Sequence, residues 1–262
     1  MDPLRIALLT SQHATGVERL LADPNRGFTW DLSIVVGSEP HLAEAALLEE
    51  ARVPLELRPM RLVPAFRNLR AREDYDQDLG DLLARLHVDF ILLDGYEYIL
   101  TEAVTARFPG KILAIHDADF SIRDRVVYSG PHAVRDAILA GETETRSSVY
   151  LVTRDVARGP LFLLGPPYPV AHMALDARKR GDVEFILAYA ELHRKWMRTT
   201  CWGDMLARTL ELLAGGTMSI IGDVVWIDGA PGPCRMGEAP HACHEPEAML
   251  ARGIPRSCPF IG

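Results

Sequence analysis

One histidine and two aspartates stand close together in the sequence, as acid–base or metal chemistry would require. His116 is followed directly by Asp117 and then by Asp119, and His132 comes after a Gly-Pro turn. Imidazole and carboxylate groups transfer protons and bind divalent metals. Side chains of neighbouring strand residues point to opposite faces, so His116 and Asp117 share one ion only where the strand has ended. We predict no metal here. Proton transfer and a purely structural histidine with solvated carboxylates remain the two interpretations.

The end of the chain holds a second group of potential metal ligands. Its members are Cys234, His241, Cys243, His244 and Cys258. Their spacing matches no standard zinc finger or ribbon, and a Cys-X-X-Cys pair is absent. Four cysteines are also too few to form a disulfide framework in 262 residues. The sequence therefore predicts free thiols and a reducing compartment.

Apolar runs and helical patterns alternate along the chain and would position these residues. The apolar runs predict strands at residues 5–10, 32–36, 90–93, 112–115 and 147–153. Helical spacing predicts helices at residues 41–51, 74–86, 101–108 and 132–140. Thr101 is the expected N-cap of its helix, and Gly141 is expected to end the last one.

The C-terminal third continues with a long helical pattern at residues 182–214, in which Gly203 is the expected break or kink. Two short strands, 218–221 and 224–227, flank Gly222 and Asp223 as a hairpin. We predict an α/β fold of Rossmann type. Its sheet is mostly parallel and twisted, with helices on both faces, followed by a C-terminal hairpin and an irregular tail. The domains are residues 1–230 and a C-terminal extension, 231–262.

Composition limits the classes of function. The chain is 48% apolar and 24% charged, which is typical of a globular protein. Its net charge of −8 argues against partners made of nucleic acid or anionic membrane. Apolar runs are too short to cross a bilayer, and the N-terminus lacks a signal-peptide pattern. We expect a cytoplasmic protein with a small-molecule substrate, while the oligomeric state stays open.

Ligands of parallel sheets bind beyond the carboxyl ends of the strands. In this chain that rule selects the loops at residues 11–16, 94–98, 116–120 and 153–159. The same loops carry a resemblance that spans residues 5–229. The blocks are RIALLTSQHATG, DFILLDGYEYIL, KILAIHDADF, YSGPHAVRDAILAG, SSVYLVTRDVARGPLFL and WIDG. In this order they resemble the formyltransferase family typified by glycinamide ribonucleotide formyltransferase, which implies that family's fold and 10-formyltetrahydrofolate as formyl donor.

The resemblance also implies a catalytic set, and this chain keeps only part of it. The family uses an Asn and a His to bind an oxyanion and an Asp to move protons. Its Asn falls on Ala114, its His on His116, the following Pro on Asp117, and its Asp on Ala157. Alanine supplies neither a hydrogen bond nor a proton, so the mechanism cannot operate unchanged. His116 is then the expected catalytic residue that polarises the formyl oxygen. The candidate acids are Asp155, preferred because it shares the loop of the missing Asp, and Asp117 and Asp119.

The first loop departs from the family as well. Where the family has glycines that let backbone N–H groups approach a phosphate, this chain has Gln12 and Ala14. A phosphoribosyl substrate is therefore not expected, although other members of the superfamily use other acceptors. The expected substrate-binding residues are Ser11, Gln12, His13, Gly130 and His132.

Two further loops match those that hold the folate in the family. Tyrosine rings there could stack on a planar heterocycle, or they could simply pack on the edge of the sheet. The expected cofactor-binding residues are Asp94, Gly95, Tyr96, Tyr98, Ile99, Leu100, Thr153, Arg154 and Ala157.

Together these features favour a divergent formyltransferase-like enzyme. The expected reaction is folate-linked formyl transfer to an amine or hydroxylamine of a small metabolite. Two alternatives remain open at this point: a catalytically inactive folate- or metabolite-binding protein, and a different enzyme, such as a hydrolase or a metal-dependent lyase, on the same fold.

Overall fold

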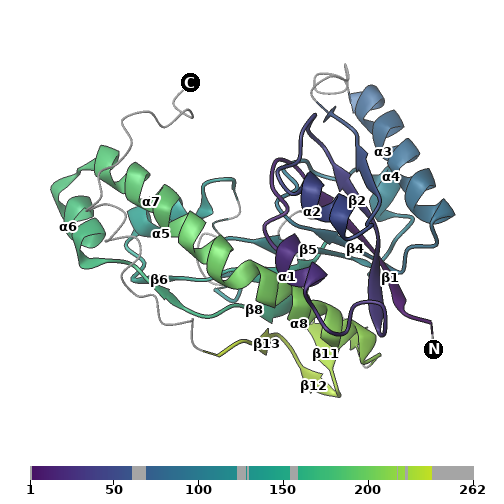
Figure 1. The fold of residues 1–262 in the computed structure, drawn as a ribbon. Helices are drawn as coiled ribbons and strands as arrows, with labels where there is room; N and C mark the ends of the chain where they lie inside the picture. The colour runs from purple at the N-terminus through teal and green to yellow at the C-terminus, as the bar shows by residue number, and fades with distance from the viewer. Residues whose placement is uncertain are drawn as a thin grey trace.

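The structure is a computed structural model of the chain. It describes residues 2–60, 69–122, 128, 130–153, 159–216, 218–221 and 224–237. These residues form an eight-stranded sheet in the order β13-β8-β7-β5-β4-β1-β2-β3 (Figure 1). Two smaller sheets, β10-β11-β12 and β6-β9, lie outside it.

The large sheet is mostly parallel, as the sequence predicts. Its parallel part consists of β1 (Leu4–Thr10), β2 (Trp30–Gly37), β3 (Leu55–Leu57), β4 (Phe90–Leu93) and β5 (Ile112–His116). β7 (Ser148–Leu151) runs antiparallel to both β5 and β8 (Leu161–Leu164). β13 (Cys234–Arg235) then pairs parallel with β8, so the beginning of the predicted tail extends the main sheet.

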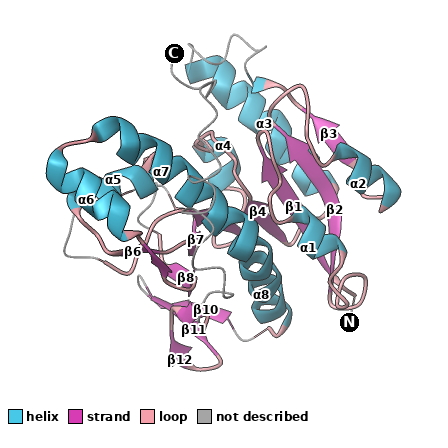
Figure 2. Ribbon diagram, turned by 60° about the vertical axis from the view of Figure 1, so that its left-hand side comes forward, coloured by secondary structure: helices cyan, strands magenta, loops and turns pink. Residues whose placement is uncertain are grey.

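Helices cover both faces of this sheet (Figures 1 and 2). One face carries α3 (Leu69–Arg85) and α4 (Glu102–Thr105). The other face carries α1 (Val17–Leu21), α2 (Ala45–Glu50), α5 (Ala133–Ala140), α6 (His172–Arg180), α7 (Val183–Met197) and α8 (Gly203–Ala214). Neighbouring strand residues contribute to different cores: Leu8 packs with α1 and α8, and Leu9 packs with α3 and α4. This alternation is the period of two that a strand imposes.

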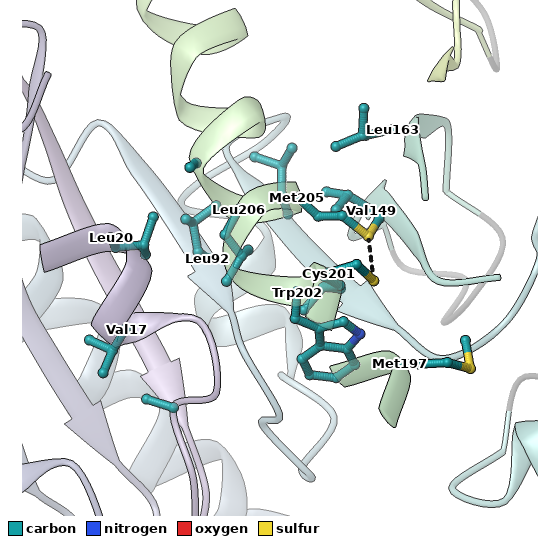
Figure 3. Packing of buried hydrophobic residues seen from close by; sticks show 14 of the residues in the cluster. Val17, Leu20, Leu92, Val149, Leu163, Met197, Cys201, Trp202, Met205 and Leu206 are labelled. Carbon is teal, nitrogen blue, oxygen red and sulfur yellow. Dashed lines mark hydrogen bonds between the residues drawn. The ribbon is translucent and has the colours of Figure 1, made fainter. Parts of the chain in front are cut away.

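Of the break or kink predicted at Gly203, the break is absent, because the helix continues through this residue. Gly203 has helical angles, φ −59° and ψ −46°, and the irregular part is the π-helical turn Arg198–Trp202 just before it. A Cβ at Gly203 would lie 2.6 Å from Arg19 Cβ, so the glycine lets α8 approach α1 closely. Figure 3 shows Leu206 of α8 facing Leu20 of α1 in this contact.

Several helix ends also differ from expectation. The helix expected at residues 41–51 is Ala45–Glu50, and the helix expected at 101–108 is Glu102–Thr105. Thr101 is the N-cap residue, but its hydroxyl makes no capping bond; its backbone N–H instead donates to Asp76 Oδ2 at 2.6 Å. Gly141 ends α5 with φ +96°, as predicted from its lack of a Cβ.

The C-terminal hairpin is present. Antiparallel β10 (Met218–Ile221) and β11 (Val224–Ile227) form it, and β12 (Ala230–Pro231) adds a third strand. The second small sheet joins β6 (Glu144–Thr145) to β9 (Tyr168–Pro169). Across the described ranges, no helix has both the length and the apolar character needed to span a bilayer. The turn at Gly222 and Asp223 and the chain from residue 238 onward lie outside the described residues.

Candidate functional site

The carboxyl ends of β1, β4 and β5 meet at one edge of the sheet. Leu9 of β1 pairs in register with Leu93 of β4, which pairs with Ala114 of β5. From β1 the chain builds outward to β2 and β3, then returns to the other side of β1 as β4. Loops diverge where strand order reverses in this way, and ligands of α/β sheets bind there.

His116 is the last residue of β5 and is half-buried. Strand alternation places it on the same face as Ala114, which is 5% exposed in the core that faces α3 and α4. The imidazole ring lies 5.5 Å from the ring of Phe120, which in turn meets Tyr150 at 5.1 Å. Aromatic rings therefore hold the imidazole at the edge where the strands end.

Asp117 is directed to the opposite face of the sheet. Its Oδ2 accepts from Arg198 Nε at 2.7 Å and lies 2.6 Å from Nη2, while the side chain is only 3% exposed. The Arg198 guanidinium stacks 4.4 Å above the Trp202 ring, whose Nε1 donates to Ser147 Oγ at 3.0 Å. The structure thus binds Asp117 to the α7–α8 turn rather than to His116, as strand alternation predicts.

The loop after β5 is held back against β7. Ser148 Oγ donates to the Ala118 carbonyl at 2.6 Å and accepts from the Phe120 N–H at 3.1 Å. Asp119 Oδ1 accepts from the Ser121 N–H at 2.9 Å, and its Oδ2 lies 3.6 Å from Arg146 Nε. Asp119 therefore shapes this loop, and its predicted role as a catalytic acid stays a prediction.

Asp94 follows β4 directly and is completely buried. Its Oδ2 accepts from the Gly16 N–H at 2.8 Å, and its Oδ1 has no hydrogen-bond partner among the residues that the structure describes. Burial raises the pKa of this carboxyl to about 7, against the opposing effects of the Gly16 hydrogen bond and the Arg198 charge. Gly95 next to it turns the chain with φ +69°, a conformation that favours glycine.

Tyr96 and Tyr98 meet edge to face at 5.9 Å between ring centroids. The Tyr98 hydroxyl donates to Glu39 Oε1 at 3.3 Å, and the Arg72 guanidinium lies 5.3 Å above the Tyr98 ring. The Tyr96 hydroxyl is buried with no hydrogen-bond partner within the described part of the chain, and burial raises its pKa. Both tyrosines line the loop that was expected to hold the folate.

The rest of this loop is anchored by α3. Arg72 donates to the Ile99 carbonyl, and Asp76 accepts from the Thr101 N–H. Ile99 is 62% exposed, whereas Leu100 is buried in the core below. Sequence reasoning did not single out Arg72 or Asp76. The helix expected at residues 74–86 includes Asp76 but not Arg72, and their i,i+4 spacing appears only because α3 begins at Leu69.

Among the predicted substrate-binding residues, Ser11 is the most constrained. Its buried Oγ lies 2.8 Å from Ser38 Oγ and accepts from the Glu97 N–H at 3.0 Å. Gln12 is half-buried and His13 is exposed, so both border the same edge. Ser11 therefore connects the loops that follow β1, β2 and β4.

The other predicted residues follow β5 and β7 or lie outside the described part of the chain. Gly130 precedes α5, and His132 is its exposed N-cap residue. Thr153 is exposed beyond the end of β7. The predicted residues outside the described part are Arg154, Asp155 and Ala157.

No group of three or more His, Cys, Asp or Glu side chains suited to a metal ion occurs within residues 2–237 as far as they are described. Cys234 lies in β13 with a free thiol. The remaining members of the C-terminal group lie outside the described residues: His241, Cys243, His244 and Cys258.

Comparisons with known proteins agree with this arrangement. The family model described as formyl transferase matches residues 4–172. Phosphoribosylglycinamide formyltransferase of Haemophilus influenzae is 29% identical over 160 residues, covering 61% of this chain and 70% of that protein. Formyltetrahydrofolate deformylase of Escherichia coli K12 is 24% identical over 160 residues, covering 61% of this chain and 52% of that protein.

A solved structure gives the same fold over a longer span. Phosphoribosylglycinamide formyltransferase of Coxiella burnetii superposes with a TM-score of 0.66 at 19% identity, covering 90% of this chain and all of the other. That similarity covers a larger share of the chain than the family match does. With a family match over well over half of its length, the chain belongs to the formyl transferase family.

Proposed function

We propose that this protein is an enzyme that transfers a formyl group from 10-formyltetrahydrofolate to an amine or hydroxylamine of a small metabolite. The observation that carries the proposal is the position of His116. It ends β5 at the edge where strand order reverses, on the face it shares with Ala114. A half-buried imidazole at such an edge can donate a hydrogen bond to a carbonyl oxygen.

The β4–α4 loop fits a bound folate by the polar atoms that it leaves without partners. The Tyr96 hydroxyl is buried and has no partner among the described residues, and it lies beside Tyr98. A planar heterocycle with several donors and acceptors could satisfy that hydroxyl and pack on the rings. When bound, the folate supplies a formyl group on an amine nitrogen that can leave.

The roles of this chain's residues in the transfer follow from that placement. His116 holds the formyl oxygen while the acceptor nitrogen attacks the formyl carbon. The new carbon–nitrogen bond forms at the acceptor, the bond to the folate nitrogen breaks, and the acceptor's proton ends on the folate nitrogen. Asp155, in the loop expected to close the site, is the proposed carrier of that proton.

Folate binding without catalysis is the second candidate. It is favoured by Ala114, whose methyl group is 5% exposed in an apolar core, so that this position gives no donor beside His116. The same assay also detects transfer of the formyl group to water instead of an amine. This reaction is included because one relative is named a formyltetrahydrofolate deformylase.

The test combines binding and turnover. Thermal melting with and without a reduced folate reports binding, because a ligand that binds only the folded state raises the melting temperature. Turnover of 10-formyltetrahydrofolate is followed by absorbance, with and without amine acceptors. We expect His116→Ala to reduce turnover by about a hundredfold, the scale of losing one acid or oxyanion donor.

His172→Ala is the matched control, because His172 is exposed on α6 away from this edge. Stabilisation by folate with no turnover would support the second candidate. A His116→Ala variant as active as the wild type, or the absence of folate stabilisation, would overturn the proposal.

A further inference from the structure

The loop between β1 and α1 has backbone donors that are already occupied. The Ala14 N–H donates to Glu44 Oε2 at 3.0 Å, and the Gly16 N–H donates to Asp94 Oδ2 at 2.8 Å. The carboxyls come from two other elements, since Glu44 is the N-cap residue of α2 and Asp94 follows β4. Backbone N–H groups in such a loop are what a phosphate would bind. In this chain, side-chain carboxylate oxygens accept those backbone hydrogen bonds instead.

The geometry shows that these contacts are built into the fold. Asp94 is fully buried, and the Glu44 side chain is 18% exposed. A Cβ at Gly16 would lie 2.5 Å from Leu206 of α8, so this end of the loop is also packed against a helix. A phosphate entering here would have to displace both carboxyls, and it would meet the negative charge of Glu44.

The described residues around the loop carry an excess of acid. Glu39 and Glu97 follow β2 and β4, and Glu44 lies beside the loop itself. Two guanidiniums face part of this acid: Arg198 is paired with Asp117, and Arg72 lies above the Tyr98 ring, whose hydroxyl donates to Glu39. The group beside Glu44 is the His13 imidazole, whose Nδ1 lies 3.6 Å from Glu44 Oε1. Such surroundings attract a positively charged or neutral ligand and repel an anion.

Buried acceptor atoms without donors point to the same kind of ligand. Asp117 Oδ1 has no hydrogen-bond partner in the described ranges, and its side chain is 3% exposed. Asp94 Oδ1, also without a partner there on a side chain that is 0% exposed, is an acceptor when Asp94 is ionised. The two aspartates follow adjacent strands, and Asp94 lies directly against the β1–α1 loop. A primary amine is a donor, often a cation, and complements such atoms, whereas a doubly ionised phosphate offers only further acceptors.

We propose that Glu44 and Asp94 are specificity-determining residues through which the acceptor site selects an unphosphorylated amine and rejects a phosphate-bearing one. This inference rests on the proposed function, because it names the class of acceptor for that reaction. It also gives these carboxyls a role beyond fastening the loop. A purely structural role would leave ligand selectivity unchanged when the charge is removed.

The first experiment uses inorganic phosphate as the probe and needs no folate. Calorimetric titrations compare the wild-type protein with Glu44→Ala, which frees the Ala14 N–H, and with Glu44→Gln, which keeps an acceptor but removes the charge. Glu49→Ala is the control, since Glu49 is an exposed residue of the same helix. We expect phosphate affinity to rise by about tenfold or more in Glu44→Ala and by less in Glu44→Gln, with Glu49→Ala matching the wild type.

The second experiment compares two acceptors that share the same amine, glycinamide and glycinamide ribonucleotide. With 10-formyltetrahydrofolate, the wild-type kcat/KM is expected to favour glycinamide, and Glu44→Gln is expected to reduce that preference. Phosphate binding as tight in the wild type as in Glu44→Ala, or a wild-type preference for the ribonucleotide, would overturn the inference. If folate fails to bind, the proposed function fails, while the phosphate titration still decides the inference by itself.

Discussion

Asp94→Asn is the change that tests most directly how the buried edge of the sheet is organised. Asparagine has nearly the same shape, and its side-chain oxygen can still accept the Gly16 N–H bond that Asp94 Oδ2 accepts at 2.8 Å. What the substitution removes is a titratable proton in a fully buried position. The difference in stability between the two proteins should therefore depend on pH.

The sign and size follow from the pKa. Burial raises the pKa of Asp94 from 3.8 to about 7, so the folded protein holds a proton that the unfolded chain releases. Wild-type stability then decreases, relative to the variant, as the pH rises from about 4 to about 7. Over that interval the wild type should lose about 4 kcal/mol of unfolding free energy relative to the variant, at about 1.4 kcal/mol for each pKa unit. Above about pH 8 the difference should become constant.

Urea unfolding at a series of pH values from about 4 to 8 measures this difference. Subtracting one protein from the other cancels the titration of groups that do not interact with Asp94. Asp78→Asn, at an exposed position on α3, is the control, because it makes the same substitution at the surface. A pH-independent difference, or a wild type that gains stability over the variant as the pH rises, would refute the assignment of a raised pKa to Asp94.

Three further predictions address other parts of the fold. Burial lowers the pKa of His193 from 6.5 to about 4. The free energy of unfolding of the wild type should therefore fall by about 3 kcal/mol as the pH drops through this interval. His193→Gln should remove that pH dependence when unfolding is measured in acid. Arg198→Met should lower the free energy of unfolding, measured in urea, by about 3–5 kcal/mol, because it leaves Asp117 buried without its cation. The double variant that also carries Asp117→Asn should recover part of that loss. Ala114→Asn should lower the melting temperature, at a cost of about 1–3 kcal/mol, because its site is closely packed; an unchanged melting temperature would mean that the space is open.

Much of the fold follows from local pattern. The apolar run of residues 90–93 coincides with β4, and Gly141 ends α5 as its missing Cβ predicts. Gly203 shows where this reasoning fails. A glycine inside a helical pattern weakens the helix locally, but this one meets Arg19 of α1, and that contact depends on tertiary packing.

The candidate site divides in the same way. The position of His116 at a strand end could be predicted, because the end of an apolar run is a local property. The pairing of Asp117 with Arg198 could not, since the partners are separated by 81 residues and come from a strand end and a helical turn. The same holds for Glu44 and Ala14, which lie 30 residues apart. Such contacts arise only once the layers have packed.

The ion pair between Asp117 and Arg198 also constrains how this sequence can evolve. Asp117 lies inside the segment that matches the family, residues 4–172, and Arg198 lies beyond it. Losing the arginine first leaves a buried carboxylate, and losing the aspartate first leaves the guanidinium on the Trp202 ring without its ion-pair partner. Each change is therefore harmful until the other has occurred, so the two positions should covary among relatives. A chimera that joins residues 1–172 to the C-terminal helices of a relative with proline at the position of Asp117 should be destabilised, because Asp117 would be buried without its arginine.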